Sequence, residues 1–233
     1  KIKNKNLETI NEILFIDNRS SDGTLETIIT QSKNLKKKIT IIQNDKNYGL
    51  GGSHKVALNY ARINGYKDLI VFHGDDQGNI DDLDKMLSED LNRNFHFILG
   101  SRFMRNSVLK NYSFLRIVGN YVFNLIFSII SLKKLSDLGS GLNLIRLENI
   151  DINQIESFPD NLTFNYHLIL YICYFDKRYK FIPITWSETD QVSNVKYFNH
   201  VLQMIKIIFN FVINKKNFFK KVEKRYTWKV VNN

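Results

Sequence analysis

Asp68-Leu69-Ile70-Val71-Phe72-His73-Gly74-Asp75-Asp76-Gln77-Gly78 is the stretch that decides the fold of this chain. Its first half is a continuous apolar run, the pattern of a central strand in a sheet that helices cover on both faces. Its second half is a polar turn that carries two adjacent carboxylates, an imidazole and a carboxamide between glycines. Because ligands in open α/β sheets gather at the carboxyl ends of strands, we expect a binding site at this turn.

Asp75, Asp76 and Gln77 offer hard oxygen ligands side by side. This donor set suits Mg²⁺ or Mn²⁺ held together with a substrate phosphate. The alternative is an acidic turn whose carboxylates only cap the next helix. A polar cluster at the end of a buried strand is costly unless something uses it, so we favour the metal site for Asp75.

Strands and helices alternate on both sides of this stretch. Apolar runs at 12–17, 39–43 and 95–99 predict three further strands, with helical patterns between them. This alternation predicts an α/β fold with a mostly parallel sheet flanked by helices. Asn47 and Gly49 belong to a glycine-rich turn that permits close approach to a ligand, although its spacing matches no nucleotide-binding fingerprint.

The composition, 233 residues of which 43% are hydrophobic, is typical of one well-cored globular domain. The single cysteine, Cys173, excludes an intrachain disulfide and fits a reducing cytoplasmic environment. We expect no secretory signal at the start of the chain. The apolar runs at 117–132 and 201–213 are shorter than the ~20 residues that span a bilayer, but either could lie on its surface.

Six of the ten net positive charges come from residues 214–233, where seven basic residues accompany one glutamate. Lysines interleaved with aromatic side chains suit an anionic membrane surface. A solvated end without a partner is the alternative, and nucleic acid is the poorer partner because no nucleic-acid-binding motif accompanies the charge. We expect a domain over 1–198 and a basic, amphipathic helical tail over 199–233.

Five short motifs follow one another along the chain: Asp17-Asn18-x-Ser20-x-Asp22-Gly23-Thr24, Asn47-x-Gly49-x-Gly51, Gly74-Asp75-Asp76-Gln77, Gly100-Ser101-Arg102-Phe103 and Asp137-x-x-Ser140-Gly141. In this order they resemble the family 2 glycosyltransferases with the GT-A, Rossmann-like fold. Within that family they are similar to the polyprenyl-phosphate glycosyltransferases of the dolichol-phosphate mannosyltransferase type. The resemblance implies metal-dependent, inverting transfer of a sugar from a GDP- or UDP-linked donor to a polyprenyl-phosphate lipid. It also implies a cytoplasmic protein at the inner face of the plasma membrane.

The resemblance assigns roles to single residues. The catalytic residues that it implies are Asp75, Asp76, Gln77 and Asp137. The donor-binding residues that it implies are Asp17, Asn18, Asp22, Asn47, Gly49, Asp75 and Gln77. The acceptor-binding residues that it implies are Arg102, Arg116, Ser140 and Lys196. The metal ligands that it implies are Asp75, Gln77 and His73.

Two departures from the family pattern leave alternatives open. His73 stands where most relatives have an aspartate, so its imidazole either replaces that metal ligand or is a structural hydrogen-bonding group. Nothing before Glu12 matches the family's first strand, so we expect a chain that lacks this strand, as a fragment would. Both departures also suit a relative that binds nucleotide sugars without catalysis.

The acceptor class rests on the absence of an obvious base. A hydroxyl acceptor needs a general base, whereas a phosphate is already an anionic nucleophile. In the acceptor half of the sequence Glu188 is the one carboxylate that we consider for this role. We therefore favour a lipid phosphate over a glycan hydroxyl.

Overall fold

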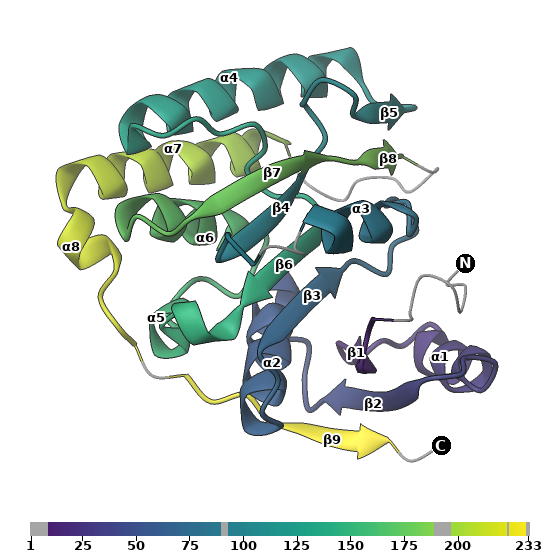
Figure 1. Cartoon of the computed structure of the whole chain (residues 1–233). Helices are drawn as coiled ribbons and strands as arrows, with labels where there is room; N and C mark the ends of the chain where they lie inside the picture. The colour runs from purple at the N-terminus through teal and green to yellow at the C-terminus, as the bar shows by residue number, and fades with distance from the viewer. Residues whose placement is uncertain (1–8, 90–92, 189–196, 223, 232–233) are drawn as a thin grey trace.

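The structure is a computed structural model that describes residues 9–89, 93–188, 197–222 and 224–231. Helices and strands alternate along its N-terminal half, which confirms the α/β class (Figure 1). The strands are β1 (Glu12–Asp17), β2 (Lys38–Asn44), β3 (Asp68–Phe72), β4 (Phe97–Ser101), β5 (Val108–Lys110), β6 (Leu142–Arg146), β7 (Tyr179–Pro183), β8 (Thr185–Ser187) and β9 (Trp228–Val231). The helices are α1 (Thr24–Ser32), α2 (Gly49–Ile63), α3 (Asp82–Glu89), α4 (Phe114–Ser131), α5 (Ile152–Glu156), α6 (Phe164–Tyr174), α7 (Tyr197–Ile213) and α8 (Lys215–Phe218).

The first sheet has the strand order β1-β2-β9. β1 runs parallel to β2 and begins with Glu12 opposite Lys38. β9 joins the other side of β2 in the antiparallel direction, with Trp228 opposite Asn44. β2 is therefore the central strand, and β1 is an edge strand.

The second sheet has the strand order β3-β6-β4-β7 and is mixed. β4 and β7 are parallel, whereas β6 runs antiparallel to both of its neighbours, β3 and β4. The prediction of a mostly parallel sheet is therefore wrong in this sheet. The reason is the return path of the chain: Asp137, just before β6, pairs with Arg102, just after β4, so β6 starts where β4 ends.

Helices fix the two sheets relative to each other. α6 is buried along most of its length and forms the centre of the larger core, as expected for a helix that is apolar all round. α2 contacts both β1 and β3, so it bridges from the first sheet to the second (Figure 1). Its buried face carries Val56, Ala57, Leu58 and Ala61.

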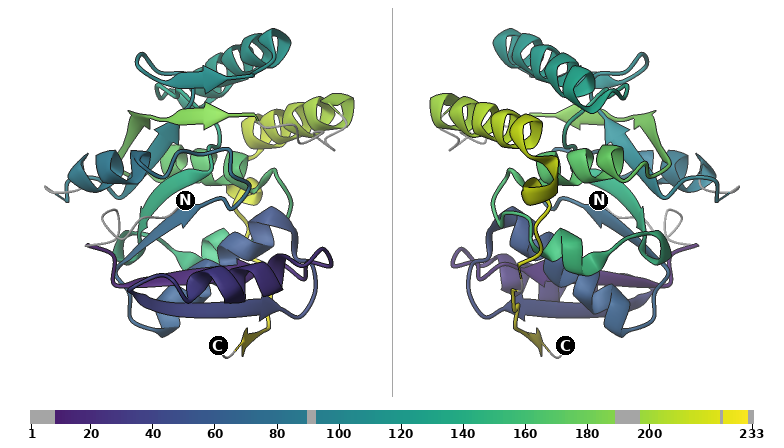
Figure 2. Two further views of the ribbon diagram at one scale, coloured as in Figure 1. Left: turned by 90° about the vertical axis from the view of Figure 1, so that its right-hand side faces the viewer. Right: turned by 90° about the vertical axis from the view of Figure 1, so that its left-hand side faces the viewer.

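α4 and α7 lie side by side on the part of the molecule remote from β1 and β2 (Figures 1 and 2). Among the described helices, α4 alone is long and apolar enough to cross a membrane, by length and composition only. Its inward face carries Asn124 and Phe127, which are buried against the body of the protein.

The tail differs from the sequence prediction beyond α8. α7 and α8 are helical, but the chain then runs back along the molecule and ends as β9 (Figure 1). Tyr226 packs edge-on against Tyr48, with ring centroids 5.1 Å apart, and Trp228 packs against the same small core. The prediction of a wholly helical tail is therefore wrong, because its last aromatic residues complete the first sheet.

Candidate functional site

A cavity of about 1620 Å³ lies between the two sheets. Its walls include all of β3, most of β1 and one face of α2. The turn after β1, at Asn18, and the turn after β3, from His73 to Asn79, both line it. One cavity therefore collects polar groups from the carboxyl ends of two strands, which is where ligands bind in α/β sheets.

The turn after β3 presents the predicted catalytic group. Asp75 is half-buried, and its Oδ1 accepts a hydrogen bond from the Gln77 backbone N–H at 3.2 Å. Asp76 is exposed and has a φ of 62°, in the left-handed region that Asp tolerates better than most residues. The Ser187 N–H donates to the Gln77 carbonyl at 2.8 Å and ties the turn to β8. The Asp75 carboxylate thus braces its own turn, and helix capping does not account for it.

Asparagine side chains meet beside the turn after β1. The Asn18 Oδ1 accepts hydrogen bonds from the Tyr48 backbone N–H and from the Asn44 Nδ2, both at 2.9 Å. The Asn18 Nδ2 donates to the Asn47 Oδ1, also at 2.9 Å. This network fixes the turn after β1 against the turn after β2. Asn18 and Asn47, two of the predicted donor-binding residues, are thereby brought together.

Asp17 and Asp22 make contacts that brace the loop itself. Asp17 is buried, and its carboxylate accepts from the Gln43 side chain at 2.8 Å and from the Ser20 N–H at 3.1 Å. Asp22 is exposed, and the Thr24 hydroxyl and N–H donate to it, which lowers the pKa of the Asp22 carboxyl. A donor-binding role for these two residues stays a prediction.

Gly49 and Gly51 bring the start of α2 against the backbone of the segment 159–161. Gly49 has a φ of +72°, and a Cβ on it would lie 2.6 Å from the Asp160 carbonyl oxygen. A Cβ on Gly51 would lie 2.4 Å from the Pro159 carbonyl oxygen. These glycines accommodate a neighbouring loop, and contact of Gly49 with a donor stays a prediction.

We expect Gly51→Ala to lower the free energy of unfolding by about 1–3 kcal/mol, because the added methyl group overlaps a backbone carbonyl. Gly119 in α4 has open space around it, so Gly119→Ala should instead raise the free energy of unfolding by up to ~1 kcal/mol through its better helix propensity. Urea unfolding of both variants measures the difference. Equal stability of Gly51→Ala and the wild type would mean that the segment 159–161 yields to α2.

Two imidazoles meet in the cavity wall. His54 of α2 and His73 after β3 have ring centroids 5.5 Å apart and nearly perpendicular planes. Burial lowers the pKa of each to about 4, assisted at His73 by the charge of Arg102. The Nε2 atom of each ring is buried without a hydrogen-bond partner in the described structure. His73 is therefore neutral at pH 7, the form that binds metals, but its ring packs on His54 and Gly141.

We expect the protein to lose stability as the pH falls from about 6.5 to about 4. In this range the unfolded chain binds a proton at His54, whereas the buried imidazole of the folded state, with a pKa of about 4, does not. For His54 alone the loss is about 2 kcal/mol near pH 5. Urea unfolding at about pH 7 and pH 5 measures this loss of stability. His54→Gln should remove the share of the loss that comes from His54. An identical pH dependence in the variant would show that His54 contributes nothing to it.

Arg102 and Asp137, which the sequence assigned to different roles, bind each other. The Arg102 Nε and Nη2 donate to the two carboxylate oxygens of Asp137, each at 2.8 Å, and the Arg102 backbone N–H donates to the same carboxylate at 2.9 Å. Asp137 is 1% exposed. The guanidinium also donates hydrogen bonds to the Gly139 carbonyl and the Tyr112 hydroxyl, and it lies over the rings of Phe103 and Trp186. Asp137 thus positions Arg102, and the catalytic and acceptor-binding roles of the two residues stay predictions.

The other predicted acceptor residues are dispersed around this pair. Arg116 forms an ion pair with Glu188, and its guanidinium lies 4.8 Å from the ring centroid of Tyr112. Ser140 is buried and donates to the Leu142 carbonyl at 3.3 Å. Lys196 lies outside the described residues. The structure therefore groups Arg102 and Arg116 around Tyr112 but leaves Ser140 inside the fold.

The donor set around Asp75 fits a divalent cation only in part. In the part of the chain that the structure describes, no three His, Cys, Asp or Glu side chains form a metal-binding group. Mg²⁺ and Mn²⁺ do not need one, since one or two carboxylates together with substrate phosphates and water hold them in many enzymes. Asp75, half-buried in a cavity wall with Gln77 beside it, meets that smaller requirement.

The cavity also separates two open sheet edges. β1 and β3 are each the outer strand of a sheet, both line the cavity, and no described strand lies between them. The prediction that the apolar run of β3 is a central strand is therefore wrong, because β6 is its one neighbour among the described strands. An edge strand leaves a row of backbone donors and acceptors unpaired. The cavity is also larger than the about 300–1,000 Å³ of common small-molecule sites.

The sequence analysis missed His54 and the face of α2 to which it belongs. Leu50, His54, Ala57 and Ala61 all line the cavity. Their spacing of three to four residues places them on one side of a helix. That periodicity could have identified this face of the helix, but sequence alone could not show that the face lines a cavity.

A family model described as Glycosyl transferase family 2 matches residues 3–150. The uncharacterized protein MJ1222 of Methanocaldococcus jannaschii is 27% identical over 147 residues, which are 63% of this chain and 58% of that protein. The crystal structure of S. aureus TarS 1–349 in complex with UDP has a TM-score of 0.52 and 18% identity, and the match covers 85% of this chain and 56% of that one. The chain thus spans less than two thirds of either relative. Since the family model covers more than half of the chain, this protein belongs to glycosyl transferase family 2.

Proposed function

We propose that this protein takes part in sugar transfer from a nucleotide-sugar donor, GDP- or UDP-linked, to a polyprenyl-phosphate lipid. The observation that carries the proposal is the convergence of two polar turns on one cavity. Asn18 follows β1 and holds Asn47, which follows β2, while Asp75 follows β3; Asn18 and Asp75 both line the cavity. The relative TarS was crystallised with UDP, which supports a nucleoside diphosphate as the ligand of this fold.

The two turns suit the two parts of such a donor. Asn18 and Asn47 carry amide groups, which hydrogen-bond a base or ribose, and the donor roles of Asp17, Asp22 and Gly49 belong to this part of the proposal. Asp75, Asp76 and Gln77 face the diphosphate. A divalent cation, Mg²⁺ or Mn²⁺, would neutralise charge on the departing nucleoside diphosphate there. Asp75 and Gln77 would hold that cation, with His73 as a further candidate ligand.

The acceptor is assigned from the arginines. Arg102, held by Asp137, contacts the Tyr112 hydroxyl, and Arg116 contacts the Tyr112 ring. Guanidinium groups recognise phosphate through charge-assisted hydrogen bonds. Ser140 and Lys196 complete the proposed acceptor set. Glu188, the one carboxylate considered as a general base, is paired with Arg116. This pairing supports a phosphate acceptor over a glycan hydroxyl, which remains the second candidate.

The setting of the reaction is part of the same proposal. A lipid acceptor requires contact with the cytoplasmic face of the plasma membrane, and we assign that contact in part to the basic tail over 199–233. The catalytic domain is proposed to span residues 1–198. The chain is proposed to lack the family's first strand, and the open edges of β1 and β3 along the cavity support this.

Isothermal calorimetry with GDP and with UDP, each with and without Mn²⁺, tests the proposal. We expect one nucleotide to bind, and to bind more tightly when Mn²⁺ is present. A protein that binds the nucleotide but releases none from its sugar conjugate in the presence of polyprenyl phosphate would instead be a non-catalytic nucleotide-sugar-binding relative. Absence of binding to both nucleotides would contradict a donor site in this cavity.

A further inference from the structure

The outward faces of α4 and α7 carry apolar stripes that nothing in the described structure covers. On α4 the stripe consists of Leu115, Val118, Val122, Leu125 and Ile129, all exposed. The spacing of three and four residues is the pattern by which helices bury one face. Leu125, near the middle of the stripe, is 61% exposed.

α7 repeats the pattern beside it. Its outward stripe consists of Leu202, Ile205, Phe209 and Val212, which are exposed, and Phe209 is 63% exposed. Its inward stripe, Met204, Ile207 and Phe211, is already buried in the core. The packing of α7 therefore accounts for one of its two apolar faces and leaves the second unexplained.

Basic side chains outnumber the described carboxylates around the two stripes, where Glu188 pairs with Arg116 and Asp176 pairs with Lys133. Neither α4 nor α7 contains an aspartate or glutamate. Exposed basic side chains flank them: Arg105 before α4, Lys134 after it, Lys206 on α7, and Lys215 and Lys216 directly after α7. An apolar surface bordered by cations complements an anionic bilayer, in which lysines reach the headgroups and apolar side chains the acyl region.

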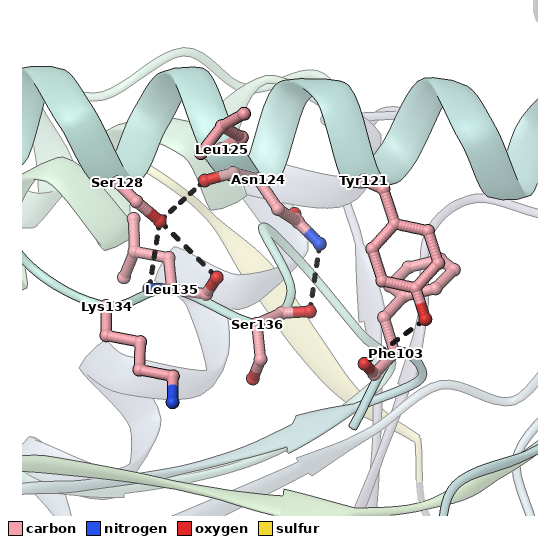
Figure 3. Close-up of a pocket in the computed structure, with 8 residues that line it drawn as sticks. All are labelled: Phe103, Tyr121, Asn124, Leu125, Ser128, Lys134, Leu135 and Ser136. Atoms are coloured by element: carbon pink, nitrogen blue, oxygen red, sulfur yellow. Dashed lines mark hydrogen bonds between the residues drawn. The ribbon is translucent and has the colours of Figure 1, made fainter. Parts of the chain in front are cut away.

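A pocket beside α4 has the same character. It has a volume of about 460 Å³, and Tyr121 and Leu125 of α4 line it opposite Phe103 and Leu135 (Figure 3). The Asn124 Nδ2 donates to the Ser136 carbonyl at 2.9 Å, whereas the Asn124 Oδ1 and the Ser136 Oγ are buried without a hydrogen-bond partner in the described structure. The ammonium group of Lys134 stands at the same pocket (Figure 3). An apolar recess beside a cation suits the acyl chain and charged headgroup of an anionic lipid.

We propose that α4 and α7 together form a docking face that lies in the interfacial layer of an anionic lipid bilayer. The occupant is the bilayer and not a second copy of the chain, because a symmetric pairing would place the basic border of one copy against that of the other. α4 lies on the membrane and does not cross it, since Phe127 and Asn124 hold its inner face to the protein. Because α7 belongs to the tail over 199–233, this inference extends the membrane contact of the proposed function to a defined face, and the segment beyond α8 is not needed for it.

Sedimentation with sucrose-loaded vesicles of phosphatidylcholine and phosphatidylglycerol tests the proposal. We expect the wild type to bind these vesicles, and the double variant Leu125→Glu/Phe209→Glu to bind at least about tenfold more weakly. Each change removes apolar area that the bilayer would bury and adds a negative charge. Ile63→Glu is the matched control: Ile63 is 69% exposed but lies at the end of α2. It should bind as the wild type does.

Three results would overturn the proposal: no binding of the wild type to the vesicles, equal binding of the double variant, or equal loss in Ile63→Glu. A concentration-dependent dimer of the wild type that the double variant abolishes, seen by analytical ultracentrifugation, would identify a second copy as the occupant. Circular dichroism of each variant establishes that it is folded, which exposed positions should permit.

A depth measurement does not depend on those substitutions. Cys173 is buried, so a cysteine introduced by Leu125→Cys can be labelled selectively with an environment-sensitive fluorophore. On anionic vesicles we expect a blue shift and quenching by spin-labelled lipids. The same label at Ile63→Cys should show neither. A label at Leu125→Cys that stays in water on vesicle-bound protein would contradict the docking face.

Discussion

Asp75→Asn should lower the rate of sugar release from the nucleotide sugar by about two to three orders of magnitude, because transfer loses the negative charge that holds the cation at the diphosphate. The substitution keeps the size of the side chain and an oxygen that accepts the Gln77 N–H bond. The turn should therefore keep its shape while losing its affinity for Mn²⁺. Release of GDP or UDP from its sugar conjugate, with polyprenyl phosphate as acceptor, measures the rate.

Asp84→Asn is the matched control. Asp84 is exposed on α3, outside the proposed machinery, so removal of its charge should leave the rate unchanged. Calorimetry separates the cation from the nucleotide: Asp75→Asn should abolish the gain in nucleotide affinity that Mn²⁺ gives and keep the metal-free affinity. Wild-type activity in Asp75→Asn would exclude Asp75 as the essential metal ligand.

Arg102→Leu should lower the free energy of unfolding by about 3–5 kcal/mol, because it leaves the buried Asp137 carboxylate without its partner. Asp137 is 1% exposed and the Arg102 side chain 13% exposed, so solvent screens the pair weakly. Arg102→Lys should lower the free energy of unfolding by less, since an ammonium group keeps the positive charge but not the two parallel hydrogen bonds. Urea unfolding at about pH 7 measures both.

Arg105→Leu provides the comparison, since Arg105 is an exposed arginine three residues along the same loop. A surface change of this kind stays within about 0.5 kcal/mol. If Arg102→Leu cost no more than Arg105→Leu, the Arg102–Asp137 ion pair would not form in solution, and Asp137 would not position Arg102 for an acceptor phosphate. The size of the loss therefore bears on function as well as on stability.

The strands of the N-terminal half follow from local sequence. The predicted run at 12–17 coincides with β1, and the run at 39–43 lies within β2. The run at 95–99 begins two residues before β4 and overlaps its first half. Each is a short apolar run closed by polar or glycine residues, so its burial is decided locally. The direction of β6 is not decided by local sequence, because it depends on where the chain returns to the sheet. The Arg102–Asp137 pair marks that point of return, and it joins residues far apart in sequence.

In the candidate site, too, local sequence predicted some features, whereas others depend on contacts between distant parts of the chain. The turn at Asp75 was predicted from a strand that ends in polar residues, and Asn18 was predicted from the family resemblance; both line the cavity. The family resemblance assigned Asp137 a catalytic role, and its neighbours in sequence do not reveal a partner. In the folded protein its charge is neutralised by Arg102. Sequence reveals which side chains carry charge, but only the fold reveals which of them are already paired.

β9 has a consequence for the folding of the chain. The Tyr48 hydroxyl meets Thr227 beside β9 across 179 residues of sequence, and β2 obtains its second neighbour only from this strand. Contacts of such separation close slowly. During synthesis on the ribosome, β2 therefore keeps one unpaired edge until nearly all of this sequence has emerged. The first sheet should then be the last part of the protein to become resistant to proteases. It should also be the part most prone to aggregate during folding.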